Sequence, residues 1–124
     1  MIDISRETVD KLRSALQPER LLKTATSLVG IPSPTRDGTA VSDCLANILQ
    51  EDGFAVERPE AGWSKAPAVA SRYTVDDSGR TLQFNGHLDT VHLPFVPPRV
   101  ENGILYGSGA SDMKGGIAAM VEAM

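Results

Sequence analysis

The chain has 124 residues, which is enough for one folded domain and too few for two of ordinary size. Hydrophobic residues make up 41% and charged residues 23%, a globular composition that excludes an intrinsically disordered chain. The net charge of −4 offers no basic surface to nucleic-acid phosphates, so we expect no nucleic-acid partner.

The N-terminal residues and the cysteine content favour a cytoplasmic protein. Charged residues interrupt the first seven positions, where a secretory signal would need a continuous apolar stretch. No window approaches the roughly 18 apolar residues of a membrane span, so we expect no membrane partner. The single cysteine, Cys44, excludes an intrachain disulfide and a thiolate zinc site, so any metal must be held by nitrogen and oxygen atoms.

The first part of the chain is predicted to be helical. Apolar residues at helical spacing predict one helix over residues 9–16 and a second over 18–29, which begins with a proline. Two prolines and two glycines predict an irregular surface loop over residues 30–38. A third amphipathic helix follows this loop, with Gly53 as the residue after its C-cap.

The pattern changes to strands after Gly53. Strand-like patterning predicts extended segments over residues 54–57, 68–75 and 81–87. A turn sequence over residues 76–79 joins the last two segments, which we therefore expect to form an antiparallel hairpin. The pair Asn102-Gly103 predicts a second, tight hairpin, and helical spacing returns after the glycine-rich segment that follows.

Two residues at the end of the apolar run 81–87 have the chemistry of a metal site. Side chains alternate in a strand, so His87 and Asp89 would lie on one face while Leu88 lies on the other. An imidazole that ligates a metal usually donates its other N–H to a carboxylate, and Asp89 is placed for that role. The competing interpretation is an ordinary histidine near a loop and a turn-forming aspartate, and spacing alone does not exclude it.

The glycine-rich segment over residues 107–116 carries a second acidic candidate, Asp112. A phosphate-binding loop is disfavoured, because Asp112 stands where Gly-x-Gly-x-x-Gly requires its last glycine and because Gly115 follows Lys114 in place of Ser or Thr. Two interpretations stay open. Asp112 is the N-cap of the following helix, or it offers both carboxylate oxygens to metal ions.

Together, residues 86–91 and 106–116 closely resemble two signatures of a family of zinc-dependent amidohydrolases and peptidases, peptidase family M20. Its members include acetylornithine deacetylase, succinyl-diaminopimelate desuccinylase, aminoacylase and glutamate carboxypeptidase. The resemblance extends to the loop over residues 28–34 and to the Asn102-Gly103 hairpin. It implies an α/β fold, with helices packed on a mixed β-sheet, as in the N-terminal portion of a zinc-exopeptidase-like catalytic domain.

The resemblance also implies roles for individual residues. His87 would ligate one zinc ion, Asp112 would bridge two, and Asp89 would be the catalytic residue that orients His87. Co²⁺ or Mn²⁺ could replace zinc. The peptide bond between Asp112 and Met113 is expected to be cis, and His92, the only other histidine, is expected to be an ordinary surface residue.

We expect residues 1–124 to form only the N-terminal part of a catalytic domain, because the last helical pattern runs to Met124 without a capping signal. The family's general-base glutamate, its remaining metal ligands and its dimerisation domain would lie further along a full-length, homodimeric protein. Catalytic zinc normally needs three protein ligands and a water, so the 124 residues alone are expected to be inactive.

The implied reaction is hydrolysis of an amide bond in a small-molecule substrate, an N-acyl amino acid or a short peptide. Two metal ions would polarise the carbonyl while the glutamate deprotonates the attacking water. The alternative is a naturally short, non-catalytic relative that uses the same fold for binding or assembly. A nucleotide-binding module is a third class, which the glycine spacing disfavours.

Overall fold

The computed structural model describes residues 4–60, 62–76, 78–91 and 94–124, so the expected surface position of His92 lies outside the described residues. The helices in chain order are α1 (Arg6–Ala15), α2 (Pro18–Val29), α3 (Thr39–Glu51) and α4 (Gly115–Ala123). The strands are β1 (Val56–Glu57), β2 (Ala70–Ser71), β3 (Arg99–Glu101) and β4 (Ile104–Tyr106). A kinked turn with π-type hydrogen bonding, η1 (Ala110–Lys114), leads directly into α4.

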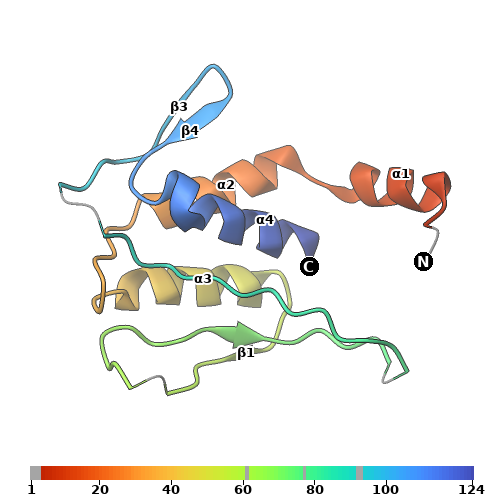
Figure 1. Ribbon diagram of the computed structural model, residues 1–124, viewed down its shortest axis with the longest axis horizontal. Coiled ribbons are helices and arrows are strands. Elements are labelled where there is room, and N and C mark those ends of the chain that lie inside the picture. The colour runs from red at the N-terminus through yellow and green to blue at the C-terminus, as the bar shows by residue number, and fades with distance from the viewer. Residues whose placement is uncertain (1–3, 61, 77, 92–93) are drawn as a thin grey trace.

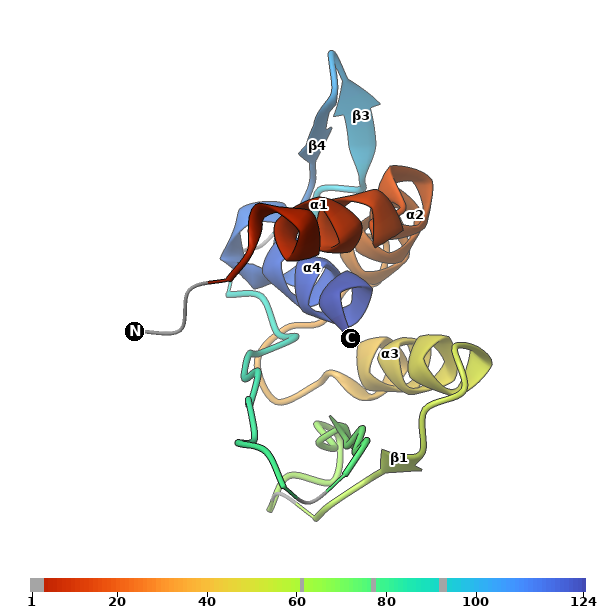
Figure 2. The same ribbon diagram turned by 90° about the vertical axis from the view of Figure 1, so that its right-hand side faces the viewer.

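Three helices form the body of the molecule. Helix α2 packs against both α4 and α3, and β1 packs against α3 (Figures 1 and 2). The side chains of these elements meet in a single apolar cluster, whose buried members are Leu28, Val41, Leu45, Leu49, Ile117 and Val121. Leu88 and Met113, which neighbour the candidate metal ligands, pack against this cluster. The core therefore supports the segments that carry the candidate site.

Local signals set the ends of the helices. The Ser5 hydroxyl accepts a hydrogen bond from the backbone N–H of Thr8 and caps α1. Helix α3 ends in a Schellman motif, in which the N–H of Gly53 bonds to the carbonyl of Gln50 and the N–H of Phe54 bonds to that of Leu49. Gly53 has a φ of 89°, so the prediction that it follows the C-cap of α3 is confirmed.

The α/β class is confirmed, and within the described residues the strands form two small antiparallel sheets in place of the expected mixed sheet. Strand β1 pairs with β2, and β3 pairs with β4. Asn102 and Gly103 both have positive φ, 51° and 77°, as a tight hairpin turn requires, so the second predicted hairpin is confirmed. One isolated parallel bridge joins Pro34 to Thr90.

The predicted hairpin between residues 68–75 and 81–87 is wrong. β2 pairs with β1, and residues 81–87 form no strand and are all exposed. The apolar run favours an extended backbone, but a strand also needs a partner with which to exchange hydrogen bonds. None of the described residues supplies that partner to residues 81–87.

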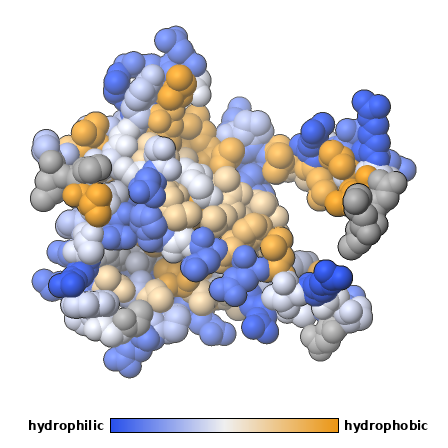
Figure 3. Space-filling model, in the orientation of Figure 1, coloured by the Kyte–Doolittle hydropathy of each residue, from blue (hydrophilic) through white to orange (hydrophobic). Residues whose placement is uncertain are grey.

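Helix α1 forms where its apolar spacing predicts it, but none of its residues is buried. It projects from the body of the molecule in Figure 1, and the space-filling view shows apolar atoms along it (Figure 3). Leu12 is 63% exposed and Leu16 is 51% exposed.

A membrane-crossing helix needs about 20 apolar residues, and none of the helices in the described ranges has that combination of length and hydropathy.

Candidate metal centre

A glycine brings the two candidate motifs together. A Cβ atom on Gly86 would lie 2.9 Å from Cε of Met113 and 3.3 Å from Cγ1 of Ile117. A side chain at this position would displace the end of the Met113 side chain, so the backbone before His87 passes close to the residue that follows Asp112. His87 and Asp112 therefore meet, although 25 residues separate them.

His87 lies between two carboxylates. Its Nδ1 lies 3.1 Å from Oδ1 of Asp89 and 3.1 Å from the carbonyl oxygen of the same residue. Its Nε2 lies 3.1 Å from Oδ1 of Asp112. The side chains of His87 and Asp89 are thus neighbours, as the alternation predicts, although their segment is not a paired strand. The structure brings together all three residues that the sequence selects.

The alternative role for Asp112, as the N-cap of the last helix, is wrong. Helix α4 has Lys114 at its N-cap position and no side-chain capping hydrogen bond. Asp112 has non-helical backbone angles of φ −129° and ψ 98°, and its carboxylate faces His87. The bond between Asp112 and Met113 is cis, as expected from the resemblance.

The hydrogen-bond partners of the His87 ring favour a cation at Nε2. If Nδ1–H donates a hydrogen bond to Asp89, the lone pair on Nε2 faces an oxygen of Asp112. Two hydrogen-bond acceptors then face each other with no proton between them. Burial lowers the pKa of His87, but the hydrogen bonds and negative charges of Asp112 and Asp89 outweigh this effect and raise the pKa above its ordinary value. A positive charge at Nε2, from a proton or a metal ion, is therefore favoured.

The separation of these two atoms also fits a shared zinc ion. Zinc binds imidazole nitrogen and carboxylate oxygen at about 2.0–2.2 Å, so two ligand atoms 3.1 Å apart can reach one ion. The side chains of His87 and Asp112 are 47% and 83% exposed, which leaves their ligand atoms accessible. Among the described residues, no group of three or more His, Cys, Asp or Glu side chains could hold a metal ion. The described residues thus offer part of a ligand set.

Sequence reasoning missed Thr35, Ser33 and Lys114. The hydroxyl of Thr35 donates a 2.7 Å hydrogen bond to Oδ2 of Asp89. The hydroxyl of Ser33 donates to the carbonyl oxygen of Leu88. The proline-rich loop over residues 30–38 gave no local signal for these contacts, because each one depends on a partner more than 50 residues away.

Lys114 is fully buried, and its Nζ donates a 2.7 Å hydrogen bond to the carbonyl oxygen of Ile31. Burial lowers the pKa of its ammonium group. A phosphate-loop lysine must reach its ligand, whereas this one is fully enclosed. The structure thus agrees with the sequence in disfavouring a phosphate-binding loop.

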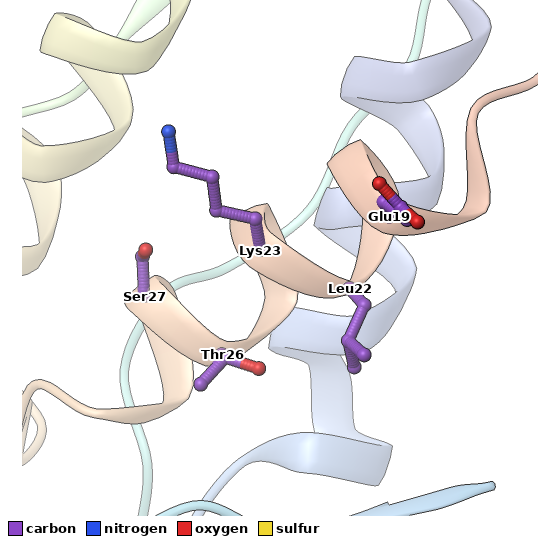
Figure 4. Close-up of a pocket in the computed structure, with 5 residues that line it drawn as sticks. All are labelled: Glu19, Leu22, Lys23, Thr26 and Ser27. Carbon is purple, nitrogen blue, oxygen red and sulfur yellow. The ribbon is translucent and has the colours of Figure 1, made fainter.

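A surface hollow beside α2 shares no residue with the candidate metal centre. It is lined by Glu19, Leu22, Lys23, Thr26 and Ser27. Figure 4 shows that Lys23 points away from Leu22, so the side chains around this hollow do not converge. We assign it no role.

Comparison with known proteins identifies the family. Residues 83–124, which include His87, Asp89 and Asp112, match the model of Peptidase family M20/M25/M40. A succinyl-diaminopimelate desuccinylase of Methylobacterium radiotolerans is 38% identical over 117 residues, covering 86% of this chain and 29% of the relative. The chain fits a partial member of peptidase family M20.

Other relatives agree with this assignment to the M20 family. The succinyl-diaminopimelate desuccinylase of Novosphingobium aromaticivorans is 39% identical over 110 residues, covering 81% of this chain and 29% of the relative. That of Verminephrobacter eiseniae is 36% identical over 126 residues, covering 85% of this chain and 31% of the relative. The chain thus spans less than a third of the length of these curated relatives. No solved structure matches it.

Proposed function

We propose that this chain carries part of the active site of a di-zinc hydrolase, in which His87 ligates one zinc ion, Asp112 bridges two and Asp89 orients His87. One observation supports this assignment most strongly. The ring of His87 has Asp89 at Nδ1 and Asp112 at Nε2, each at 3.1 Å, so a single imidazole joins an orienting carboxylate to a ligating one.

The residues of the chain have separate tasks in this proposal. Asp89 accepts a hydrogen bond from Nδ1–H of His87, which fixes the tautomer and leaves the Nε2 lone pair free to bind a metal. Asp112 contributes a negative charge and a second ligand atom beside Nε2. Zinc held there would supply Lewis acidity toward the scissile carbonyl and lower the pKa of a bound water.

We further propose that residues 1–124 form the N-terminal part of the catalytic domain and that the rest of the complete protein supplies the other ligands and the general base. The chain covers only 29% of the Methylobacterium relative, which leaves room for those residues. A catalytic zinc ion normally has three protein ligands, so residues 1–124 by themselves would be inactive. Homodimerisation and a cytoplasmic location stay predictions from the sequence.

The substrate class that we propose is an N-acyl amino acid or a short peptide, cleaved at its amide bond. The support is the name of the relatives: a succinyl-diaminopimelate desuccinylase removes a succinyl group from its substrate. Zinc is the metal that we expect, and Co²⁺ or Mn²⁺ would fit the same nitrogen and oxygen ligands.

Metal analysis of the complete gene product tests the proposal. We expect two zinc ions per chain in the wild type and a loss of bound zinc in His87→Ala and in Asp112→Ala. The wild type and the control variant should hydrolyse an N-succinyl amino acid, and His87→Ala and Asp112→Ala should not. Asp43→Ala is the control, because Asp43 is an exposed carboxylate that pairs with Arg58. Unchanged zinc content in His87→Ala would refute the ligand assignment. A wild type without zinc and without hydrolysis would favour the non-catalytic alternative.

A further inference from the structure

Asp89 is held by both of its carboxylate oxygens. Oδ1 lies 3.1 Å from Nδ1 of His87, and Oδ2 accepts the 2.7 Å hydrogen bond from the hydroxyl of Thr35. A carboxylate with a partner on only one oxygen can rotate about its last torsion, whereas partners on both oxygens fix its plane. Thr35 therefore restricts how Asp89 is presented to the ring of His87.

The loop that carries Thr35 is bonded to the backbone on either side of Asp89. The carbonyl oxygen of Ser33 accepts a 2.8 Å hydrogen bond from the N–H of Thr90, and the hydroxyl of Ser33 donates a 2.8 Å bond to the carbonyl of Leu88. Ser33 is fully buried, so water does not compete for these two bonds. The position of Thr35 relative to Asp89 is thus set by the backbone and not by the Thr35 side chain alone.

The same loop is also attached to the segment that carries Asp112. Lys114, two residues after Asp112, donates its 2.7 Å hydrogen bond to the carbonyl of Ile31 from a fully buried position. One short loop, residues 31–35, therefore bonds to the segment that carries His87 and Asp89 and also to the segment that carries Asp112.

We propose that Thr35 is a positioning residue of the metal centre, which fixes the carboxylate of Asp89 and through it the tautomer and direction of His87. The inference rests on the proposed function, in which His87 is a metal ligand. Removing a partner that orients a metal-bound histidine typically costs about ten- to a hundredfold in metal affinity. Thr35 is one hydrogen bond further from the metal than Asp89, so we expect a loss of metal affinity of about tenfold.

Three variants of the complete gene product test this role. Thr35→Val keeps the shape of the side chain and removes the hydroxyl, while Thr35→Ser keeps the hydroxyl and removes a methyl group. Thr39→Val is the matched control, because the hydroxyl of Thr39 also donates a hydrogen bond, but to the backbone carbonyl of Lys65 and not to Asp89. Both threonines are exposed, so the substitutions leave the core intact.

The measurements are zinc affinity by competition with a chelator, the visible absorption spectrum of the Co²⁺ form, and thermal melting of the metal-free protein. We expect Thr35→Val to raise the dissociation constant of one metal ion about tenfold and to alter the Co²⁺ spectrum. Thr35→Ser and Thr39→Val should match the wild type in both measurements.

The outcomes separate this inference from the proposed function. Wild-type affinity and spectrum in Thr35→Val, with or without a lower melting temperature, would overturn the positioning role while leaving the zinc site in place. An equal loss of affinity in Thr39→Val would also overturn it, because the effect would then follow from the loss of any threonine hydroxyl in this region and not from the bond with Asp89. A wild type that binds no zinc would reject the proposed function itself and this inference with it.

Discussion

Nε2 of His87 lies 3.1 Å from Oδ1 of Asp112, while Nδ1 of the same ring lies 3.1 Å from Oδ1 of Asp89. An imidazole in this position has two stable arrangements. It carries a proton on each nitrogen, or it is neutral, donates a hydrogen bond from Nδ1–H to Asp89 and presents its Nε2 lone pair to a cation beside Asp112. A proton and a metal ion therefore compete for the same atom.

The pKa of His87 in the metal-free protein should lie above the ordinary value for histidine. Burial lowers this pKa, but the hydrogen bonds and charges of Asp112 and Asp89 outweigh burial. Because the proton stays on Nε2 to a higher pH, metal affinity should increase as the pH rises through this pKa. An NMR titration of the ring protons measures it. Asp112→Asn should lower the pKa and Asp43→Asn should leave it unchanged, whereas an ordinary or lowered pKa in the wild type would contradict the prediction.

Asp89→Asn should weaken zinc binding without unfolding the protein. The amide has no negative charge to stabilise the imidazole and can present its N–H₂ group to Nδ1, which favours the wrong tautomer. We expect an affinity loss of about ten- to a hundredfold, measured by competition with a chelator. The control is Asp43→Asn, which removes a similar charge from a surface ion pair. Equal affinities in these two variants would show that Asp89 does not orient His87.

The sequence could identify His87, Asp89 and Asp112, because their motifs are local in the chain and the alternation of an extended segment makes His87 and Asp89 neighbours. It could not identify Thr35, because the hydroxyl of Thr35 gains its role only when residues 31–35 meet residues 88–90. A polar residue in a proline-rich loop has many possible partners, and no spacing rule selects one across 54 residues.

The helices could be predicted because the signals that form them are local in the chain. The pairing of the strands could not, because it depends on residues far apart in the chain. Caps and apolar spacing act within a few residues, so Gly53 marks the end of α3 in the sequence itself. The partner of a strand is chosen by distant residues, and β2 pairs with β1 while residues 81–87 stay unpaired. The apolar spacing also predicted an apolar face on α1, but spacing alone does not predict whether other residues pack against that face.

Glu122 should make the folding stability of the protein decrease at acid pH. Its two carboxylate oxygens accept 2.7 Å hydrogen bonds from Nε of Arg20 and from the N–H of Gln17, which join α4 to the start of α2. The bond from Arg20, followed by that from Gln17, lowers the pKa of Glu122. A lowered carboxyl pKa contributes stability above the unfolded-state pKa, and this contribution is lost as the pH falls through the folded-state pKa.

Glu122→Gln should therefore lower the melting temperature at neutral pH and reduce its dependence on acid pH. Thermal melting of the metal-free protein across a series of pH values measures both effects. Glu7→Gln is the control, because Glu7 pairs with Lys11 on the surface of α1, with both side chains more than 75% exposed, and such pairs contribute little. The assignment would be contradicted if the melting temperature fell equally steeply with decreasing pH in Glu122→Gln and in the wild type.

Gly107 should tolerate alanine less well than Gly103, although both have positive φ, 146° and 77°. A Cβ on Gly107 would overlap Cγ1 of Val29, a fully buried side chain, and would lie 3.2 Å from Cα of Pro98. A Cβ on Gly103 would meet nothing within 4 Å. Alanine at the positive φ of Gly103 costs about 1–2 kcal/mol, alanine at Gly107 is also strained by its positive φ, and overpacking adds about 1–3 kcal/mol at Gly107 alone.

The comparison of the two alanine variants tests this packing effect, because both variants place alanine at a positive φ but only one meets other atoms. Denaturant unfolding of Gly107→Ala and Gly103→Ala should differ by about 1–3 kcal/mol, with Gly107→Ala the less stable. Gly107 opens the segment that ends in Asp112 and Lys114, so a shift there should also reach the metal centre and weaken zinc binding. Equal stabilities would mean that Val29 moves freely, which its complete burial in the core argues against.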